Sequence, residues 1–208
     1  MHLKRQKTAV NLPIPRKGTK YVARARSHIN NSIPVVIALR DMLKLARTEK
    51  EVKKMIYQNL IKLNGRIVKD TRESVRLFNI LEADKQYLLT LLPTGKFAFH
   101  EAKDKNHRLC KVIGKHLIKG KKIQINLHDG TNIVTNENLS VGDSIYLDFN
   151  GNIKKKEQLG KGKEAFVFSG KYLGLKGKIE LIEGNHLNIH FKDLQKSTQL
   201  NKNQIIVL

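Results

Sequence analysis

Apolar and polar positions follow two different periods along the chain, and the period changes near residue 80. Between residues 32 and 57, apolar side chains recur three or four positions apart, which is the spacing of a helix with one buried face. Beyond residue 80, apolar positions mostly alternate with polar ones, as they do in strands. The pattern therefore predicts an α+β chain that is mostly β.

Residues 32–80 are predicted to form two short helices and a hairpin. Ser32 can cap the first helix and Pro34 suits its first turn. Thr48 and Glu51 have the spacing of a capping box at the start of the second helix. The buried stripe of that second helix comprises Val52, Met55 and Ile56, with Lys53 and Lys54 facing outward.

Hairpin signals follow at several places. Asn64 and Gly65 join two short apolar runs and tolerate the positive φ angles of a tight turn. Residues 86–92 and 96–102 predict a second hairpin, and Asp129 with Gly130 marks the turn of a third. Another strand is predicted around Ile145 and Leu147.

Residues 151–164 are rich in Gly and Lys without an apolar stripe, so we expect a linker there. Three strand-like runs follow, and in the last of them Leu187, Ile189 and Phe191 point to one face. A small twisted barrel would bury these strands economically. Gly170, Gly174 and Gly177 are expected in a loop between two of the strands.

The charge of the chain indicates its class of partner. Forty Lys and Arg stand against 18 Asp and Glu, which gives a formal charge of +22 and a pI of about 10.1. Such an excess repels itself unless a polyanion is present. The sequence has no apolar stretch of about 18 residues that would suit a membrane, so a nucleic acid is the expected partner.

Two interpretations fit the basic N-terminal segment. The first acidic residue is Asp41, and Pro13 and Pro15 exclude a helix near them. The segment is either a disordered, solvated tail or an arm that becomes ordered along a phosphate backbone, and the overall charge of the chain favours the arm. It lacks the apolar core of a signal peptide, and a single Cys110 excludes an intramolecular disulfide, so a cytoplasmic protein is expected.

Catalytic and metal-binding patterns are weak. Gly177 and Lys178 do not have the spacing of a phosphate-binding loop. His186 and His190 would lie about 13 Å apart on a strand and could not share a metal ion. Cys110 lies in an apolar run, where a free Cys is usually a core residue. We therefore expect no enzymatic activity, no cofactor and no metal.

The kind of cation favours backbone contacts over base reading. Most of the cations are Lys, which binds phosphate as a mobile point charge. Aromatic residues make up only 6% of the chain and Trp is absent, so stacking platforms for single strands are poorly supplied. Recognition of shape and phosphate position favours a folded RNA.

Four stretches in one order resemble a known family. "LPIPRKGTKYV" is similar to the opening, "SIPVVIALRDMLKLARTEKEVKKMIYQNLIKLNGRIVKD" to the α-L RNA-binding motif, and "LCKVIGKHLIKGKKIQINLHDGTNI" to the central domain of small-subunit ribosomal protein four of archaeal and eukaryotic type. "VFSGKYLGLKGKI" is similar to the KOW motif that ends it. The resemblance covers nearly the whole chain.

The resemblance implies a structural protein of the small ribosomal subunit that binds ribosomal RNA beside neighbouring ribosomal proteins. It implies four parts: a basic arm at 1–31, an α-L module at 32–80, a central β-domain at 81–158 and an SH3-like KOW barrel at 159–208. The residues expected on the RNA are Arg5, Lys7, Arg16, Lys17, Lys20, Arg24, Arg26, Arg40, Arg47, Lys53, Lys54, Lys62, Arg66, Lys171, Lys176 and Lys178. Asn64, Gly65, Gly170, Gly174 and Gly177 are expected to form the loops, although the last three could simply turn the barrel.

Two other functions remain open. An RNA-modifying enzyme can carry an α-L module, but it would need a larger catalytic domain than the middle of this chain provides. A transcription or translation factor could use the KOW barrel for transient contacts.

Overall fold

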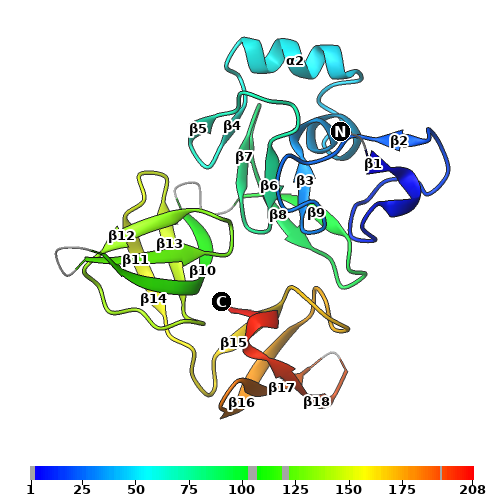
Figure 1. Ribbon diagram of the computed structural model, residues 1–208. Coiled ribbons are helices and arrows are strands. Elements are labelled where there is room, and N and C mark those ends of the chain that lie inside the picture. The colour runs from blue at the N-terminus through cyan, green and yellow to red at the C-terminus, as the bar shows by residue number, and fades with distance from the viewer. Residues whose placement is uncertain (1–2, 103–106, 119–121, 193) are drawn as a thin grey trace. The chain divides into compact units, whose positions relative to one another are not determined.

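The computed structural model describes residues 3–102, 107–118, 122–192 and 194–208, and is mostly β with a few short helices. The chain divides into two compact units, residues 1–105 and 106–208. Figure 1 shows the strands and helices of both units.

The first unit contains a five-stranded antiparallel sheet in the order β5-β4-β7-β8-β9 and two further strand pairs, β1-β2 and β3-β6. Its strands are β1 (Leu3–Lys4), β2 (Tyr21–Val22), β3 (Ser32–Pro34), β4 (Lys62–Leu63), β5 (Arg66–Ile67), β6 (Ser74–Arg76), β7 (Ile80–Glu82), β8 (Gln86–Leu91) and β9 (Phe97–Glu101). Its helical segments are the 3-10 turn η1 (Arg5–Lys7), α1 (Val35–Ile37), the π-helical turn η2 (Ala38–Met42) and α2 (Glu49–Tyr57).

The prediction that the first helix begins at Ser32 is wrong. Ser32 does not cap it, because residues 32–34 form strand β3 and pair with β6. The Ser32 hydroxyl donates instead to the carbonyl oxygens of Ser27 and His28, each at 2.9 Å. Every residue of the helical segment from Val35 to Leu39 is buried, so packing in the core rather than a cap fixes its position.

The second predicted helix is confirmed as α2. The Thr48 hydroxyl accepts from the Glu51 N–H at 3.3 Å, as an N-cap does. The Glu51 carboxylate accepts from the N–H of Arg47 at 2.7 Å, and this contact lowers the pKa of Glu51. Val52 and Ile56 are buried as expected, and Met55 is half-buried.

The predicted boundary after residue 80 falls inside strand β7, which pairs with both β4 and β8. The hairpin formed by β8 and β9 is confirmed, but it belongs to the first unit. Alternation cannot show which sheet a strand joins, since hydrogen bonds between strands distant in sequence decide that. The two-residue turn at Asn64 and Gly65 is also confirmed, with φ angles of 51° and 79°.

The second unit contains two five-stranded antiparallel sheets, in the orders β12-β11-β10-β13-β14 and β18-β17-β16-β15-β19. The elements are β10 (His107–Ile118), β11 (Lys122–Leu127), β12 (Asn132–Thr135), β13 (Ser144–Asp148), β14 (Ile153–Glu157), β15 (Glu164–Val167), β16 (Lys176–Glu183), β17 (His186–Phe191), β18 (Lys196–Asn201), the 3-10 turn η3 (Lys202–Gln204) and β19 (Ile205–Val207). Each sheet buries its own apolar cluster. Leu187, Ile189 and Phe191 are fully buried, as their alternation predicted.

The predicted linker at 151–164 is wrong over residues 153–157. These residues form β14, which pairs with β13 at the edge of the first of these sheets. The side chains of Lys154, Lys155 and Lys156 are exposed, and lysines on an edge strand discourage pairing with other chains. The three consecutive lysines hid the apolar alternation of a strand, so β14 was predicted as a linker.

Contacts between the two sheets join them within the second unit. The Lys111 ammonium of β10 donates to the carbonyl oxygens of Lys202 at 2.5 Å and Ile205 at 2.7 Å. The Val207 N–H donates to the Ser144 hydroxyl at 3.0 Å. These bonds connect β10 and β13 to η3 and to β19, the last strand of the chain.

Candidate nucleic-acid interface

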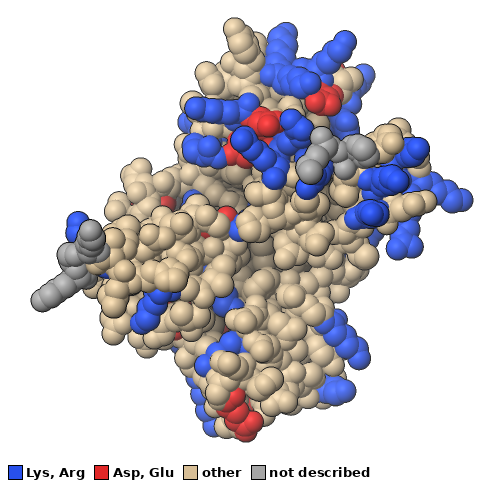
Figure 2. Space-filling model, viewed as in Figure 1, with Lys and Arg blue, Asp and Glu red and all other residues tan. Residues whose placement is uncertain are grey.

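Basic side chains gather on the first unit. Figure 2 shows Lys and Arg crowded over α2 and around the N-terminal strands, with few carboxylates between them. A surface of this kind attracts a polyanion.

Helix α2 and the β4–β5 hairpin bring four of the expected RNA-contacting residues onto exposed surface: Lys53, Lys54, Lys62 and Arg66. Lys53 pairs with Glu49 at 3.0 Å, and Arg66 pairs with Glu73. The Lys53–Glu49 pair is exposed on both sides and therefore weak, so a phosphate can displace Glu49. The Glu73 side chain is mostly buried, whereas the Arg66 side chain is exposed. The turn between the strands is held by the side chain of Asn64, whose Oδ1 accepts from the Ile80 N–H at 2.9 Å.

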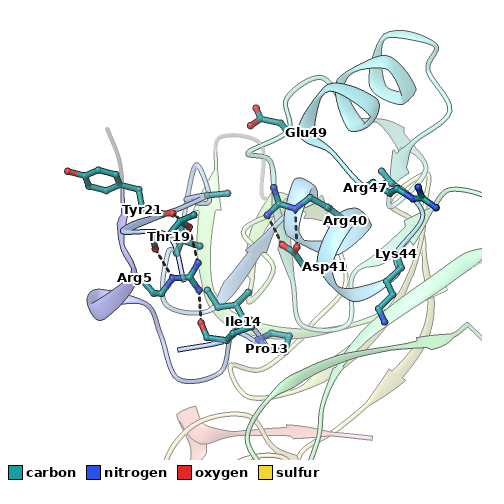
Figure 3. Close-up of a pocket in the computed structure, with 14 residues that line it drawn as sticks. Arg5, Pro13, Ile14, Thr19, Tyr21, Arg40, Asp41, Lys44, Arg47 and Glu49 are labelled. Carbon is teal, nitrogen blue, oxygen red and sulfur yellow. Dashed lines mark hydrogen bonds and ion pairs between the residues drawn. The ribbon is translucent and has the colours of Figure 1, made fainter. Parts of the chain in front are cut away.

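A cavity of about 850 Å³ lies between the N-terminal residues and the segment from Arg40 to Glu49 (Figure 3). Three of the expected residues line it, namely Arg5, Arg40 and Arg47, together with Lys44. The Arg40 guanidinium makes two hydrogen bonds to Asp41, at 2.9 and 2.8 Å, which raise the pKa of Arg40.

Arg5 closes the N-terminal segment on itself. Its guanidinium donates to the carbonyl oxygens of Pro15 at 2.5 Å and Thr19 at 2.7 Å, and to the Thr19 hydroxyl at 3.0 Å. Strands β1 and β2 pair beside it. Residues 3–22 therefore form a closed loop in this structure, and the cations around it are Lys7, Arg16, Lys17, Lys20, Arg24 and Arg26, of which Arg24 is half-buried and the others are exposed.

In the second unit the glycine-rich segment is divided. Gly170 and Gly174 lie in the loop before β16 with φ angles of 94° and 83°, and Lys171 is exposed beside them. The sequence placed Gly177 in the loop, and that prediction is wrong. Gly177 lies buried within β16. Its two neighbours, Lys176 and Lys178, point together to the exposed face of that strand.

Sequence reasoning missed the apolar side chains among these cations. Tyr57 is 89% exposed at the end of α2, Leu60 is 53% exposed just after it, and Ile67 is 38% exposed in β5. Exposed Lys69 follows. The sequence did contain a signal for the exposure of Tyr57, because Tyr57 falls outside the buried stripe of Val52 and Ile56. The low aromatic content of the whole chain was instead taken as evidence against stacking on any base.

The described residues were also compared with what a reactive thiol, a metal site and a membrane span require. Burial raises the pKa of the Cys110 thiol to about 12, so it stays protonated. Within the described ranges, no three His, Cys, Asp or Glu side chains gather as a metal would need. The same residues include no helix that is long and apolar enough to cross a membrane.

Comparison with known proteins identifies the family. The chain is 31% identical to small ribosomal subunit protein eS4 of Methanocella arvoryzae, over 88% of this chain and 81% of that protein. The chain belongs to the eS4 family. The eS4 of Methanococcus aeolicus is 33% identical over 89% of this chain and 83% of its own length. The sequence model of ribosomal family S4e also matches residues 83–153.

A solved eS4 structure supports the fold. The crystal structure of the 30S ribosomal protein S4e from Thermoplasma acidophilum superposes with a TM-score of 0.72 at 22% identity, covering 86% of this chain and 95% of that one. The arrangement of strands described above is therefore that of an eS4 protein.

Proposed function

We propose that this eS4 family member is a structural component of the small ribosomal subunit, in the cytoplasm, and that it holds ribosomal RNA by neutralising phosphates. The observation that carries the proposal is the exposed cation cluster on α2 and the β4–β5 hairpin, formed by Lys53, Lys54, Lys62 and Arg66. Family membership supports the same assignment.

The proposal assigns roles to the parts of the chain. Helix α2 with the β4–β5 hairpin is the α-L RNA-binding module. The sheet containing β15 to β19 is the SH3-like KOW barrel, with Lys171, Lys176 and Lys178 on its RNA side. The cations of the N-terminal loop and of the cavity add phosphate contacts, and neighbouring ribosomal proteins cover other surfaces.

Binding of the purified protein to protein-free small-subunit ribosomal RNA tests the proposal, with equal masses of tRNA and duplex DNA as controls. Log affinity should fall with log salt by about 0.7 to 0.9 per phosphate contact for each polyanion. A preference for the ribosomal RNA that persists at high salt supports recognition of its shape. Equal affinities that vanish together as salt rises would show that only charge is recognised.

Sedimentation separates a structural component from a transient factor. A structural component stays with the small subunit through a high-salt wash, because many contacts hold it. A factor that visits the ribosome is released into the supernatant, and that result would contradict the proposal.

A further inference from the structure

An open groove lies between the last turn of α2 and the segment after β5. It has a volume of about 400 Å³ and is lined by Lys53, Ile56, Tyr57, Asn59, Val68, Lys69, Asp70 and Thr71. Three of these lining residues are buried: Ile56 is 9%, Val68 1% and Thr71 7% exposed. The groove therefore has a firm and partly apolar base within the first unit.

Tyr57 borders the groove and is 89% exposed, so its ring is almost entirely available to a partner. Large exposed apolar side chains continue nearby at Leu60 and Ile67. An aromatic side chain exposed to this degree buries little area on folding and so contributes little to the stability of the protein. It is suited to stacking on a flat group from outside.

The charges around the groove define the partner. Lys53 and Lys69 line it, and Lys54 is exposed on the same helix. Asp70 also lines the groove, but its carboxylate accepts from the Arg72 N–H at 2.9 Å and faces the Arg72 guanidinium at 3.8 Å. The groove thus offers the aromatic ring of Tyr57, the cations Lys53 and Lys69, and a carboxylate that faces Arg72.

We propose that this groove receives one unpaired base of the bound RNA, which stacks on Tyr57 while its flanking phosphates contact Lys53 and Lys69. The inference rests on the proposed function and adds to it a specific unpaired nucleotide. A base is favoured over a phosphate next to Tyr57, because the C-terminal end of α2 carries the negative end of the helix dipole. Bases that are splayed out of folded RNA are commonly bound by stacking in this way.

Three variants test the stacking role. Tyr57→Ala should bind protein-free small-subunit ribosomal RNA about 10-fold more weakly than the wild type, with the same salt slope, because a ring is lost but no charge. Tyr57→Phe keeps the ring and should bind within about 2-fold of the wild type. Leu117→Ala is the matched control, since Leu117 is 82% exposed in the other unit and should leave affinity unchanged.

A fourth variant tests the charges. Lys69→Gln should lower the salt slope by about 0.7 to 0.9, as expected for the loss of one phosphate contact. Chemical probing of the RNA bases gives an independent readout. One base should be protected by the wild type and by Tyr57→Phe, and exposed with Tyr57→Ala.

The outcomes separate this inference from the proposed function. If the wild type prefers ribosomal RNA at high salt but Tyr57→Ala binds and protects the RNA equally well, the inference is overturned and the groove is left for a protein neighbour. If the wild type shows no preference, the proposed function fails and the inference fails with it. Equal urea midpoints of the variants confirm that the folded proteins are being compared, as expected for a side chain that is 89% exposed.

Discussion

Gly177 of β16 lies so close to Ile189 of β17 that a methyl group on Gly177 would be 2.5 Å from the Ile189 Cγ2 atom. The same methyl group would be 2.8 Å from the His190 carbonyl oxygen, which belongs to the backbone and cannot rotate away. The absence of a side chain at Gly177 therefore lets the two strands pack around the core of their sheet. This glycine serves the fold, whereas Gly170 and Gly174 serve the loop.

Gly177→Ala should accordingly lower the free energy of unfolding by about 1–3 kcal/mol, the usual cost of overpacking. Gly160→Ala is the matched control, because its methyl group would have no neighbour closer than 3.9 Å and its φ angle is not positive. Urea unfolding followed by circular dichroism measures both. Equal stability of the two variants would show that the strands separate without cost.

A buried ion pair gives a second prediction. Arg108 and Asp129 lie 3.0 Å apart with side chains only 8% and 1% exposed. Arg108→Met should destabilise the protein by about 3–5 kcal/mol, because it leaves the Asp129 carboxylate buried without its partner. Adding Asp129→Asn should recover part of that loss, and a double-mutant cycle on urea midpoints measures the coupling. Strictly additive losses would contradict the pairing.

The same pair predicts acid sensitivity. Burial tends to raise the pKa of Asp129, but Arg108 and the hydrogen bonds from Thr131 outweigh it and hold that pKa below its usual value. The resulting stabilisation is present above the unfolded pKa of about 4 and is lost as pH falls through the folded pKa. The difference in unfolding free energy between the wild type and the double variant should therefore shrink below about pH 4. A difference independent of pH would be inconsistent with this assignment.

Lys111 predicts a dependence of the same sign in a different range, at alkaline pH. Burial lowers its pKa to about 8, so between that value and the unfolded value the unfolded chain binds more protons, and stability rises with pH. A neutral amine still has two hydrogens for the carbonyl oxygens of Lys202 and Ile205. Relative to Lys111→Met, the wild type should gain about 2 kcal/mol between pH 7 and about pH 9.5. Urea unfolding at a series of pH values measures this, and a constant difference would refute it.

Arg5 predicts local rather than global effects. Arg5→Gln removes most of the bonds that tie it to Pro15 and Thr19, so amides near the β1–β2 pair should exchange faster, including the Arg5 N–H that donates to the Lys20 carbonyl. The global unfolding free energy should change by less than about 1 kcal/mol. Hydrogen exchange followed by mass spectrometry measures this. Unprotected amides at residues 3–22 in the wild type would instead favour an arm that is ordered only by RNA.

The amino-acid sequence by itself determined the local elements. The period of apolar residues located α2, the capping residue Thr48 marked its start, and Asn64 with Gly65 located a hairpin turn, because these signals depend on neighbours within a few positions. Strand alternation likewise gave the buried face of β17. Charge and motif order indicated an RNA-binding protein of the family to which the chain belongs.

Only the tertiary structure decided the features that depend on distant partners. In the structure, Ser32 belongs to a strand and does not cap a helix, and the first unit continues past residue 80. The predicted linker contains strand β14. The sequence could not show these features, because pairing between strands is not encoded in a local period. It also showed which cations are buried, such as Lys111, and that Tyr57 is exposed beside a groove. Burial is a property of the assembled core, so residues of the same type acquired different roles.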